Sequence, residues 1–277
     1  MKDKANRFWQ LHQGEDIFVM ANAWNAGSAV LLEQAGFDAI GTTSAGIAYG
    51  HAVPDSSGEL SFDTALEATR EIAGAVKIPV SMDAENAYAD SLEAVYENMQ
   101  RIAASGVVGA SIEDYSGIKG DPLYDIELAV DRVRSAVEAV AGLDYPFTLT
   151  ARAECFLIGH GDALNESIRR VNRYREAGAD CLYVPGIGDI DTIKTLVNEV
   201  DGPINVVMGL VGTPISVSQL RDAGVTRISI GGSLARATFG LVRRAAKQML
   251  EQGSFEFSKQ QIADAELCEL FAKTNPR

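Results

Sequence analysis

The sequence predicts a (β/α)8 barrel, an α/β fold, because two kinds of junction between a helical segment and a short apolar run alternate along the chain. In the first kind, the helical segment ends in Ala-Gly or Ser-Gly and the apolar run follows closely. The glycines of these junctions are Gly36, Gly106, Gly178 and Gly224. Glycine just past a helix adopts a left-handed conformation that side chains resist, so each junction predicts a helix end, a tight loop and a buried strand.

In the second kind of junction, a proline stands between the helical segment and the apolar run. These prolines are Pro79, Pro146 and Pro203. Proline has no N–H to donate to a sheet, so it belongs at the first position of a strand. Together with the opening apolar run at 16–22, the junctions give eight strands, each followed by a helix. An open doubly wound sheet is the alternative, but no GxGxxG pattern follows the first run.

We expect one barrel domain to cover residues 1–277, since the chain has 277 residues and such a barrel needs about 250. An N-terminal helix is expected at 1–14 and a helical extension at 255–277. Within that extension, the apolar residues lie on or near one face of a helix. They are Ile262, Ala265, Leu267, Leu270 and Phe271.

The composition excludes several classes of function. The chain has 24 Lys and Arg against 38 Asp and Glu, a net charge of −14, and this argues against binding of nucleic acid. Cys155, Cys181 and Cys268 are far apart, which indicates free thiols in a reducing compartment. No apolar run is long enough for a signal peptide or a membrane span. We therefore expect a cytoplasmic protein without membrane or nucleic-acid partners.

Acidic residues follow the predicted strands at the end where barrels carry their chemistry. Asp83 and Glu85 are two positions apart, so on an extended strand both would point the same way, and Glu113 follows the next strand. Carboxylates with no His or Cys nearby suit Mg²⁺, with Mn²⁺ as a second choice. Taken singly, each acid could instead cap a helix or pair with a cation. Arg152 could be such a partner, or it could hold a substrate carboxylate through its planar fork.

Several motifs resemble those of the isocitrate lyase and phosphoenolpyruvate mutase superfamily. The resemblance runs from NAWNAGSA to RISIGGSLAR, over residues 22–236. Its most specific parts are the segment 22–48, DAENAY at 83–88, IED at 112–114 and TARAECFL at 150–157. The resemblance implies a barrel enzyme that acts on a small carboxylate through an enolate.

The resemblance also implies roles for individual residues. Mg²⁺ would be held directly by Asp83, with Glu85, Glu113 and Asp55 reaching it mostly through waters. Thr43 and the N–H groups of Ser44 and Ala45 would bind the substrate carboxylate, with Arg152 at its anionic end. The remaining assignments follow from the same motifs: Trp24 for substrate binding, and Asp55, Tyr88 and Glu154 as candidate acids or bases. A homotetramer in which the last helix swaps between subunits is implied as well.

Departures from the superfamily pattern narrow the reaction. The stretch DYSGIKGDPLYD at 114–125 has no cysteine, where isocitrate and methylisocitrate lyases carry a catalytic one. Tyr115 replaces a lysine, and Pro185 a histidine, of the phosphonate-handling enzymes. Asn25 and Ala87 replace a common aspartate and a common glycine.

These departures favour a Mg²⁺-dependent lyase or decarboxylase that cleaves a carbon–carbon bond in a 2-oxo or 2-hydroxy dicarboxylate. Two alternatives stay open. One is a phosphoenolpyruvate mutase or phosphonopyruvate hydrolase type of enzyme. The other is a barrel that binds a 2-oxo acid without catalysis.

Overall fold

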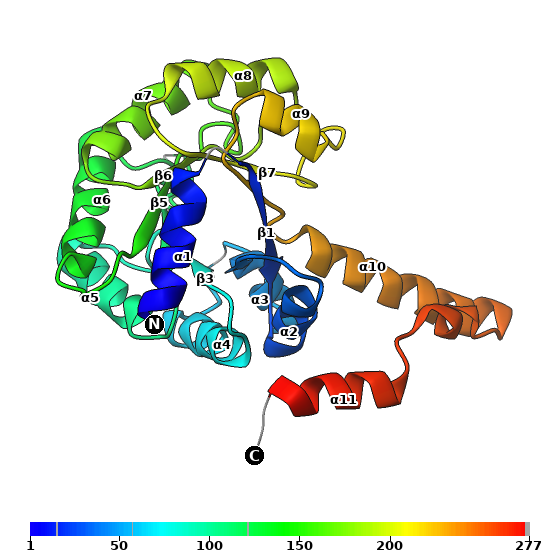
Figure 1. Cartoon of the computed structure of the whole chain (residues 1–277). Coiled ribbons are helices and arrows are strands. Elements are labelled where there is room, and N and C mark those ends of the chain that lie inside the picture. The colour runs from blue at the N-terminus through cyan, green and yellow to red at the C-terminus, as the bar shows by residue number, and fades with distance from the viewer. Residues whose placement is uncertain (15, 57, 121, 275–277) are drawn as a thin grey trace.

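Eight parallel strands close into a barrel in chain order, which confirms the predicted fold class (Figure 1). The computed structural model describes residues 1–14, 16–56, 58–120 and 122–274. The strands are β1 (Phe18–Ala23), β2 (Ile40–Thr42), β3 (Val80–Asp83), β4 (Gly109–Glu113), β5 (Thr148–Arg152), β6 (Cys181–Tyr183), β7 (Ile204–Val207) and β8 (Arg227–Ser229). β8 pairs with β1 and so completes the closure.

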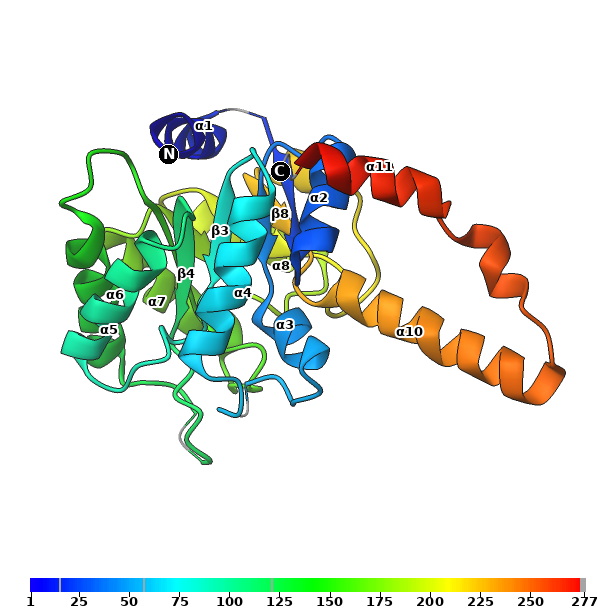
Figure 2. The same cartoon turned by 90° about the horizontal axis from the view of Figure 1, so that it is seen from below.

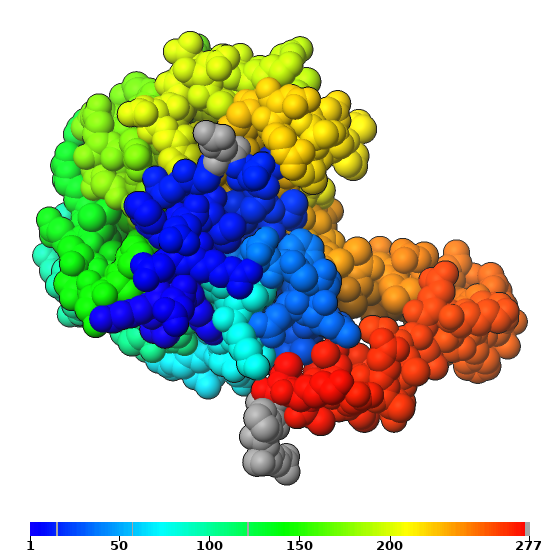
Figure 3. Space-filling model, viewed as in Figure 1, coloured from blue at the N-terminus to red at the C-terminus, as the bar shows by residue number. Residues whose placement is uncertain are grey.

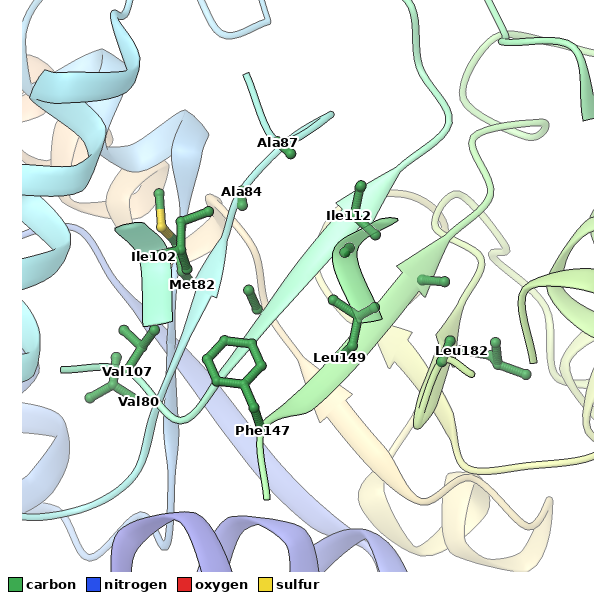
Figure 4. Packing of buried hydrophobic residues seen from close by; sticks show 14 of the residues in the cluster. Val80, Met82, Ala84, Ala87, Ile102, Val107, Ile112, Phe147, Leu149 and Leu182 are labelled. Carbon is green, nitrogen blue, oxygen red and sulfur yellow. The ribbon is translucent and has the colours of Figure 1, made fainter. Parts of the chain in front are cut away.

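Helices follow the strands and cover the outside of the barrel (Figure 2). They are α2 (Ala26–Gln34), α3 (Ser44–Gly50), α4 (Phe62–Ala75), α5 (Leu92–Ala103), α6 (Ile126–Val140), α7 (Ala163–Glu176), α8 (Ile190–Glu199), α9 (Val217–Asp222) and α10 (Ser233–Lys247). The apolar core lies between this layer and the strands, where Met82, Ile112 and Leu149 pack (Figure 4). Polar residues alternate with them along the strands, so the barrel interior is polar near its mouth.

The glycine junctions end their helices as predicted. Gly36, Gly106, Gly178 and Gly224 have φ values of +94°, +100°, +107° and +82°. The prolines Pro79 and Pro203 come directly before β3 and β7, and Pro146 lies two positions before β5. Local backbone chemistry therefore accounts for where most strands begin.

The C-terminal extension begins differently from the expectation. A 3-10 turn at Glu256–Gln260 comes first, and the helix α11 spans Asp264–Thr274, so Ile262 lies outside the helix. The predicted extension also includes 275–277, which lie outside the described residues. Figure 3 shows that α10 and the segment after it project from the barrel, and α11 returns to lie beside α2. No helix in the described part of the chain is long and apolar enough to cross a membrane.

The N-terminal helix α1 (Lys2–Gln13) packs at the end of the barrel where the strands begin, with Phe8 against Phe18 at the start of β1. Its buried His12 lies 2.8 Å from the Phe8 carbonyl oxygen through Nδ1 and 3.0 Å from a guanidinium nitrogen of Arg227 through Nε2. Since a guanidinium only donates, Nε2 accepts and the imidazole is neutral. Burial, followed by the charge of Arg227, lowers the pKa of His12 to about 3.

Because His12 is neutral in the folded protein, we predict that the protein loses stability in acid. In the unfolded chain His12 is protonated near pH 6.5. The contribution of neutral His12 to the free energy of unfolding is therefore full above that pH and is lost as pH falls toward 3. Between pH 6.5 and 4.5 the stability lost is about 2–3 kcal/mol. The difference in unfolding free energy between the native chain and His12→Gln, from urea titrations, should therefore shrink by that amount. The assignment would be contradicted if the difference in unfolding free energy were equal at pH 6.5 and pH 4.5. It would also be contradicted if His51→Gln, a change at an exposed histidine, gave the same decrease.

Candidate active site

Arg152 lies at the C-terminal end of β5 and contacts acidic side chains at the ends of the neighbouring strands. One of its terminal nitrogens is 3.2 Å from Glu113 Oε2 and 3.8 Å from Asp83 Oδ1. Its Nε donates to Glu154. Parallel pairing sets Glu113 directly beside Arg152, in register across β4 and β5. The predicted strand-end residues of β3, β4 and β5 thus share one site at the mouth of the barrel.

Asp83 is fixed by the start of α3. Its Oδ2 accepts hydrogen bonds from the Ser44 N–H at 3.0 Å and the Ser44 hydroxyl at 2.8 Å, and its Oδ1 lies 3.4 Å from the Ser111 hydroxyl. The hydroxyl of Thr43 accepts from the Gly46 N–H and caps α3. Two of the groups predicted to bind substrate, the Thr43 hydroxyl and the Ser44 N–H, are therefore engaged within the protein in this structure.

The other predicted substrate-binding groups lie around this helix. The Ala45 N–H, in the first turn of α3, has no acceptor among the described residues. Trp24 is half-buried, packs against the core and lies beside the α3 start, where a Cβ on Gly46 would come within 2.8 Å of the Trp24 Cβ. The structure thus groups Thr43, Ser44 and Ala45 beside Asp83, while Trp24 supports their helix.

Glu85 and Asp55 add negative charge beside Asp83. Burial, followed by repulsion from Asp83 and Asp55, raises the pKa of Glu85 to about 7. Burial and then Asp83 raise the pKa of Asp55. The Tyr88 hydroxyl donates to Glu85 Oε1 at 3.2 Å, and burial raises the pKa of this phenol. Arg152 therefore does not neutralise all the carboxylates of the site.

The backbone between Asp83 and Glu85 differs from the expected extended strand. Strand β3 ends at Asp83, so the two acids are not related by strand alternation. Glu85, Ala87 and Tyr88 have φ values of +46°, +62° and +51°. Left-handed conformations cost side-chain-bearing residues free energy and concentrate at functional sites. Ala87 stands where the superfamily commonly has glycine, and its positive φ explains that preference.

A buried network behind the site is a feature that sequence reasoning missed. Asp114, which is 2% exposed, accepts the Glu154 N–H at 2.9 Å through Oδ1. Its Oδ2 accepts from Arg170 at 3.1 Å and from the Tyr174 hydroxyl at 2.7 Å. Arg170 also donates to the Tyr124 carbonyl at 3.0 Å. The signal in the sequence was an arginine and a tyrosine four positions apart on the buried face of α7.

Loss of the Asp114 charge is expected to destabilise the fold. Asp114→Asn keeps an acceptor for the Glu154 N–H but leaves Arg170 buried with one fewer carboxylate. Breaking a buried ion pair costs roughly 3–5 kcal/mol. We expect urea unfolding to show a loss of that order. Asp131→Asn, which breaks an exposed pair with Arg134, is the control and should cost less than about 1 kcal/mol. Equal losses in the two variants would contradict the role of the network.

Two hollows open at the mouth of the barrel and meet at Glu113 and Tyr115. One, of about 420 Å³, is lined by the polar side chains of Asp55, Arg152 and Glu154 and by the apolar side chains of Pro122, Leu157 and Ile158. The second, of about 470 Å³, contains Glu85, Tyr88 and Phe62. Below them the barrel interior holds a small cavity of about 50 Å³ that also touches Asp83 and Arg152. The hollows give a small carboxylate room beside the acidic cluster.

The donor set fits a hard divalent cation. Within the described ranges, no group of three or more His, Cys, Asp or Glu side chains is arranged to hold a metal directly, and Arg152 contacts both Asp83 and Glu113. The groups around Asp83 are carboxylate and hydroxyl oxygens, which Mg²⁺ prefers, and Mg²⁺ usually keeps several waters. The excess of carboxylates over cationic groups leaves charge for a cation to balance.

A closed (β/α)8 barrel with its polar cluster at the C-terminal ends of the strands has the architecture of a barrel enzyme. The chain belongs to the phosphoenolpyruvate phosphomutase family, because that family's model matches residues 8–250. This membership confirms the superfamily predicted from the motifs.

Individual relatives span several activities within the family. 2-Methylisocitrate lyase of Escherichia coli K12 is 27% identical over 248 residues, which cover 87% of this chain and 81% of the lyase. A solved protein of Burkholderia cenocepacia J2315, described provisionally as a lyase/mutase, is 41% identical with a TM-score of 0.94, over 98% of this chain and 96% of that one. Phosphonopyruvate hydrolase, solved with oxalate and Mg²⁺, is 26% identical with a TM-score of 0.85, over 98% and 95%.

Proposed function

We propose that this protein is a Mg²⁺-dependent lyase that cleaves a carbon–carbon bond in a 2-oxo or 2-hydroxy dicarboxylate. The observation that carries the proposal is Arg152, which faces the carboxylates of Asp83 and Glu113 at the mouth of the barrel. Such a site can hold an anionic ligand between a guanidinium and a carboxylate-bound cation. The similarity to 2-methylisocitrate lyase and to an oxalate- and Mg²⁺-bound hydrolase supports it.

The site residues have different proposed roles, which follow from their charge and protonation. Arg152 binds a substrate carboxylate, and the N–H of Ala45 at the start of α3 binds the other end. Glu154, whose pKa is raised by burial, contacts Arg152 and is the proposed acid or base that transfers a proton to the leaving carbon. Tyr88, whose pKa is raised, stays protonated and acts as a donor that orients Glu85.

Asp83 would hold the cation, with Glu85, Glu113 and Asp55 around it, and Mn²⁺ could take the same place. The cation supplies a Lewis acid for the negative charge that develops on the substrate oxygen when the bond breaks. Ser44 and Ser111 orient Asp83 through their hydroxyls.

A substrate panel tests the proposal. With Mg²⁺ present, 2-alkylmalates, 3-alkylmalates and oxaloacetate are assayed for release of a 2-oxo acid or oxalate, and phosphonopyruvate is assayed for release of phosphate. Turnover of a malate or of oxaloacetate, abolished by EDTA, is the expected result. Phosphate release alone would support the phosphonopyruvate hydrolase alternative. Tight oxalate binding without any turnover would support a barrel that only binds its ligand.

The assembly that we propose is a cytoplasmic homotetramer in which α11, which here lies beside α2 of its own chain, docks instead on a neighbouring subunit. The end of α10 and the residues after it project from the barrel (Figure 3), and the apolar side chains of Leu250 and Val242 there are 87% and 60% exposed. Large exposed apolar patches mark sites of protein association. Sedimentation velocity at micromolar concentration should give the mass of four chains, and a monomer would contradict the proposal.

A further inference from the structure

We propose that the substrate carries an uncharged, apolar group beyond its two carboxylates, so that tricarboxylates of the isocitrate type are excluded. This inference rests on the proposed function and concerns the same site. It is drawn from the walls of the two hollows at the barrel mouth and from the supply of positive charge around them.

Positive charge is scarce in the walls. Among the described residues that line the two hollows, Arg152 is the one cationic side chain, against Asp55, Glu85, Asp90, Glu113 and Glu154. Arg152 already contacts three carboxylates. A ligand carboxylate at Arg152 and another at a cation held by Asp83 would each meet a positive charge, whereas a third carboxylate would face these acids without a cationic partner.

Three other arginines are buried among the described residues, and all three are bound elsewhere. Arg227 lines the small interior cavity, but its nitrogens donate to Asn205 at 2.8 Å and Thr150 at 3.0 Å and contact His12. Arg170 is bound by Asp114 and Glu166. Arg132 donates to the carbonyls of Asn86 and Ala89 at 2.6 and 2.7 Å. None of the three guanidiniums lines the hollows at the mouth.

One wall of the hollow beside Arg152 is apolar. It is formed by Pro122, Leu157 and Ile158, which line the same hollow as Glu113 and Glu154. A helical turn holds the wall in place, because the N–H groups of Leu157 and Ile158 donate to the Glu154 carbonyl at 3.0 and 3.2 Å. Leu157 is 42% exposed, so a bound alkyl group would remove apolar surface from water. A carboxylate at that wall would lose hydration without gaining a cation.

A matched pair of ligands tests the inference. 3-Isobutylmalate and isocitrate have the same malate body with two carboxylates and differ in a terminal isopropyl group against a third, terminal carboxylate. Calorimetric titration with Mg²⁺ present should show the isopropyl ligand binding at least about tenfold more tightly. Leu157→Lys, which puts a cation on the apolar wall, should narrow or reverse the preference. Leu157→Gln, of similar size without the charge, should leave isocitrate the weaker ligand.

Several results would overturn the inference. Equal or tighter binding of isocitrate by the native chain is one, and the loss of that binding in Lys119→Gln would then identify Lys119, in the 114–125 stretch, as the missing cation. Failure of 3-isobutylmalate to bind is another. Oxalate, titrated in parallel, separates this inference from the proposed function. No oxalate binding refutes the function itself, whereas oxalate binding with a preference for isocitrate refutes the apolar group alone.

Discussion

Replacement of Asp83 by asparagine is expected to lower turnover by about a thousandfold or more and to remove the response to Mg²⁺. Asparagine keeps an oxygen to accept the hydrogen bonds of Ser44, so the local structure survives, but the charge that holds a divalent cation is lost. A Lewis acid stabilises a transition state by several kcal/mol, and about 4 kcal/mol corresponds to that rate factor.

Two measurements check the Asp83 prediction. Steady-state kinetics gives turnover, and thermal unfolding with increasing Mg²⁺ gives binding, since a ligand at a hundred times its Kd stabilises the fold by about 2.7 kcal/mol. The native chain should show this shift and Asp83→Asn should not. Asp63→Asn, which changes an exposed carboxylate on α4, is the control and should behave like the native chain. Undiminished turnover in Asp83→Asn would reject the scheme.

Replacement of Arg152 by methionine is expected to abolish activity and also to destabilise the protein. Glu113 and Glu154 are 7% and 4% exposed, and without Arg152 both lose their principal counter-charge. Breaking such buried pairs costs roughly 3–5 kcal/mol. Burial raises the pKa of both glutamates, so their protonation in the variant should relieve part of this loss as the pH is lowered.

The effect of Arg152 on activity and its effect on stability can be measured separately. Arg152→Met combined with Glu113→Gln removes one buried charge as well, and it should recover stability at pH 8 without recovering turnover. Arg152→Lys keeps the charge but lacks the planar fork, so it should retain the fold and bind substrate weakly. Urea unfolding and initial rates provide the two readouts. A stable Arg152→Met variant at pH 8, or one with native turnover, would contradict the role assigned to this residue.

The sequence predicted most of the fold because the signals for the barrel are local. Glycines that need positive φ, such as Gly106 and Gly178, ended helices, and prolines such as Pro79 preceded strands. The same signals placed Asp83, Glu113 and Arg152 at strand ends, and parallel pairing brings strand ends together. Ile262 was placed in a helix that begins only at Asp264, because helix boundaries depend on packing as well as on pattern.

The site was harder to predict where it depends on distant contacts. Asp114 directly follows β4, but its bonds to Arg170 and Tyr174 join residues 56 and 60 positions apart. The backbone turns after Asp83, and Glu85 has a positive φ. Nothing in the DAENAY sequence indicates this turn. The engagement of the Ser44 N–H by Asp83 is likewise a contact between two loops. Long-range hydrogen bonds of this kind have no periodic signature along a chain.

A crystal structure grown with Mg²⁺ and oxalate would test the account most directly. We expect one octahedral ion bonded to a carboxylate oxygen of Asp83, with oxalate completing its shell and an oxalate oxygen within reach of the Arg152 guanidinium. An ion bound away from Asp83, or oxalate seated where Arg152 does not reach it, would show that the barrel mouth does not work in the way described.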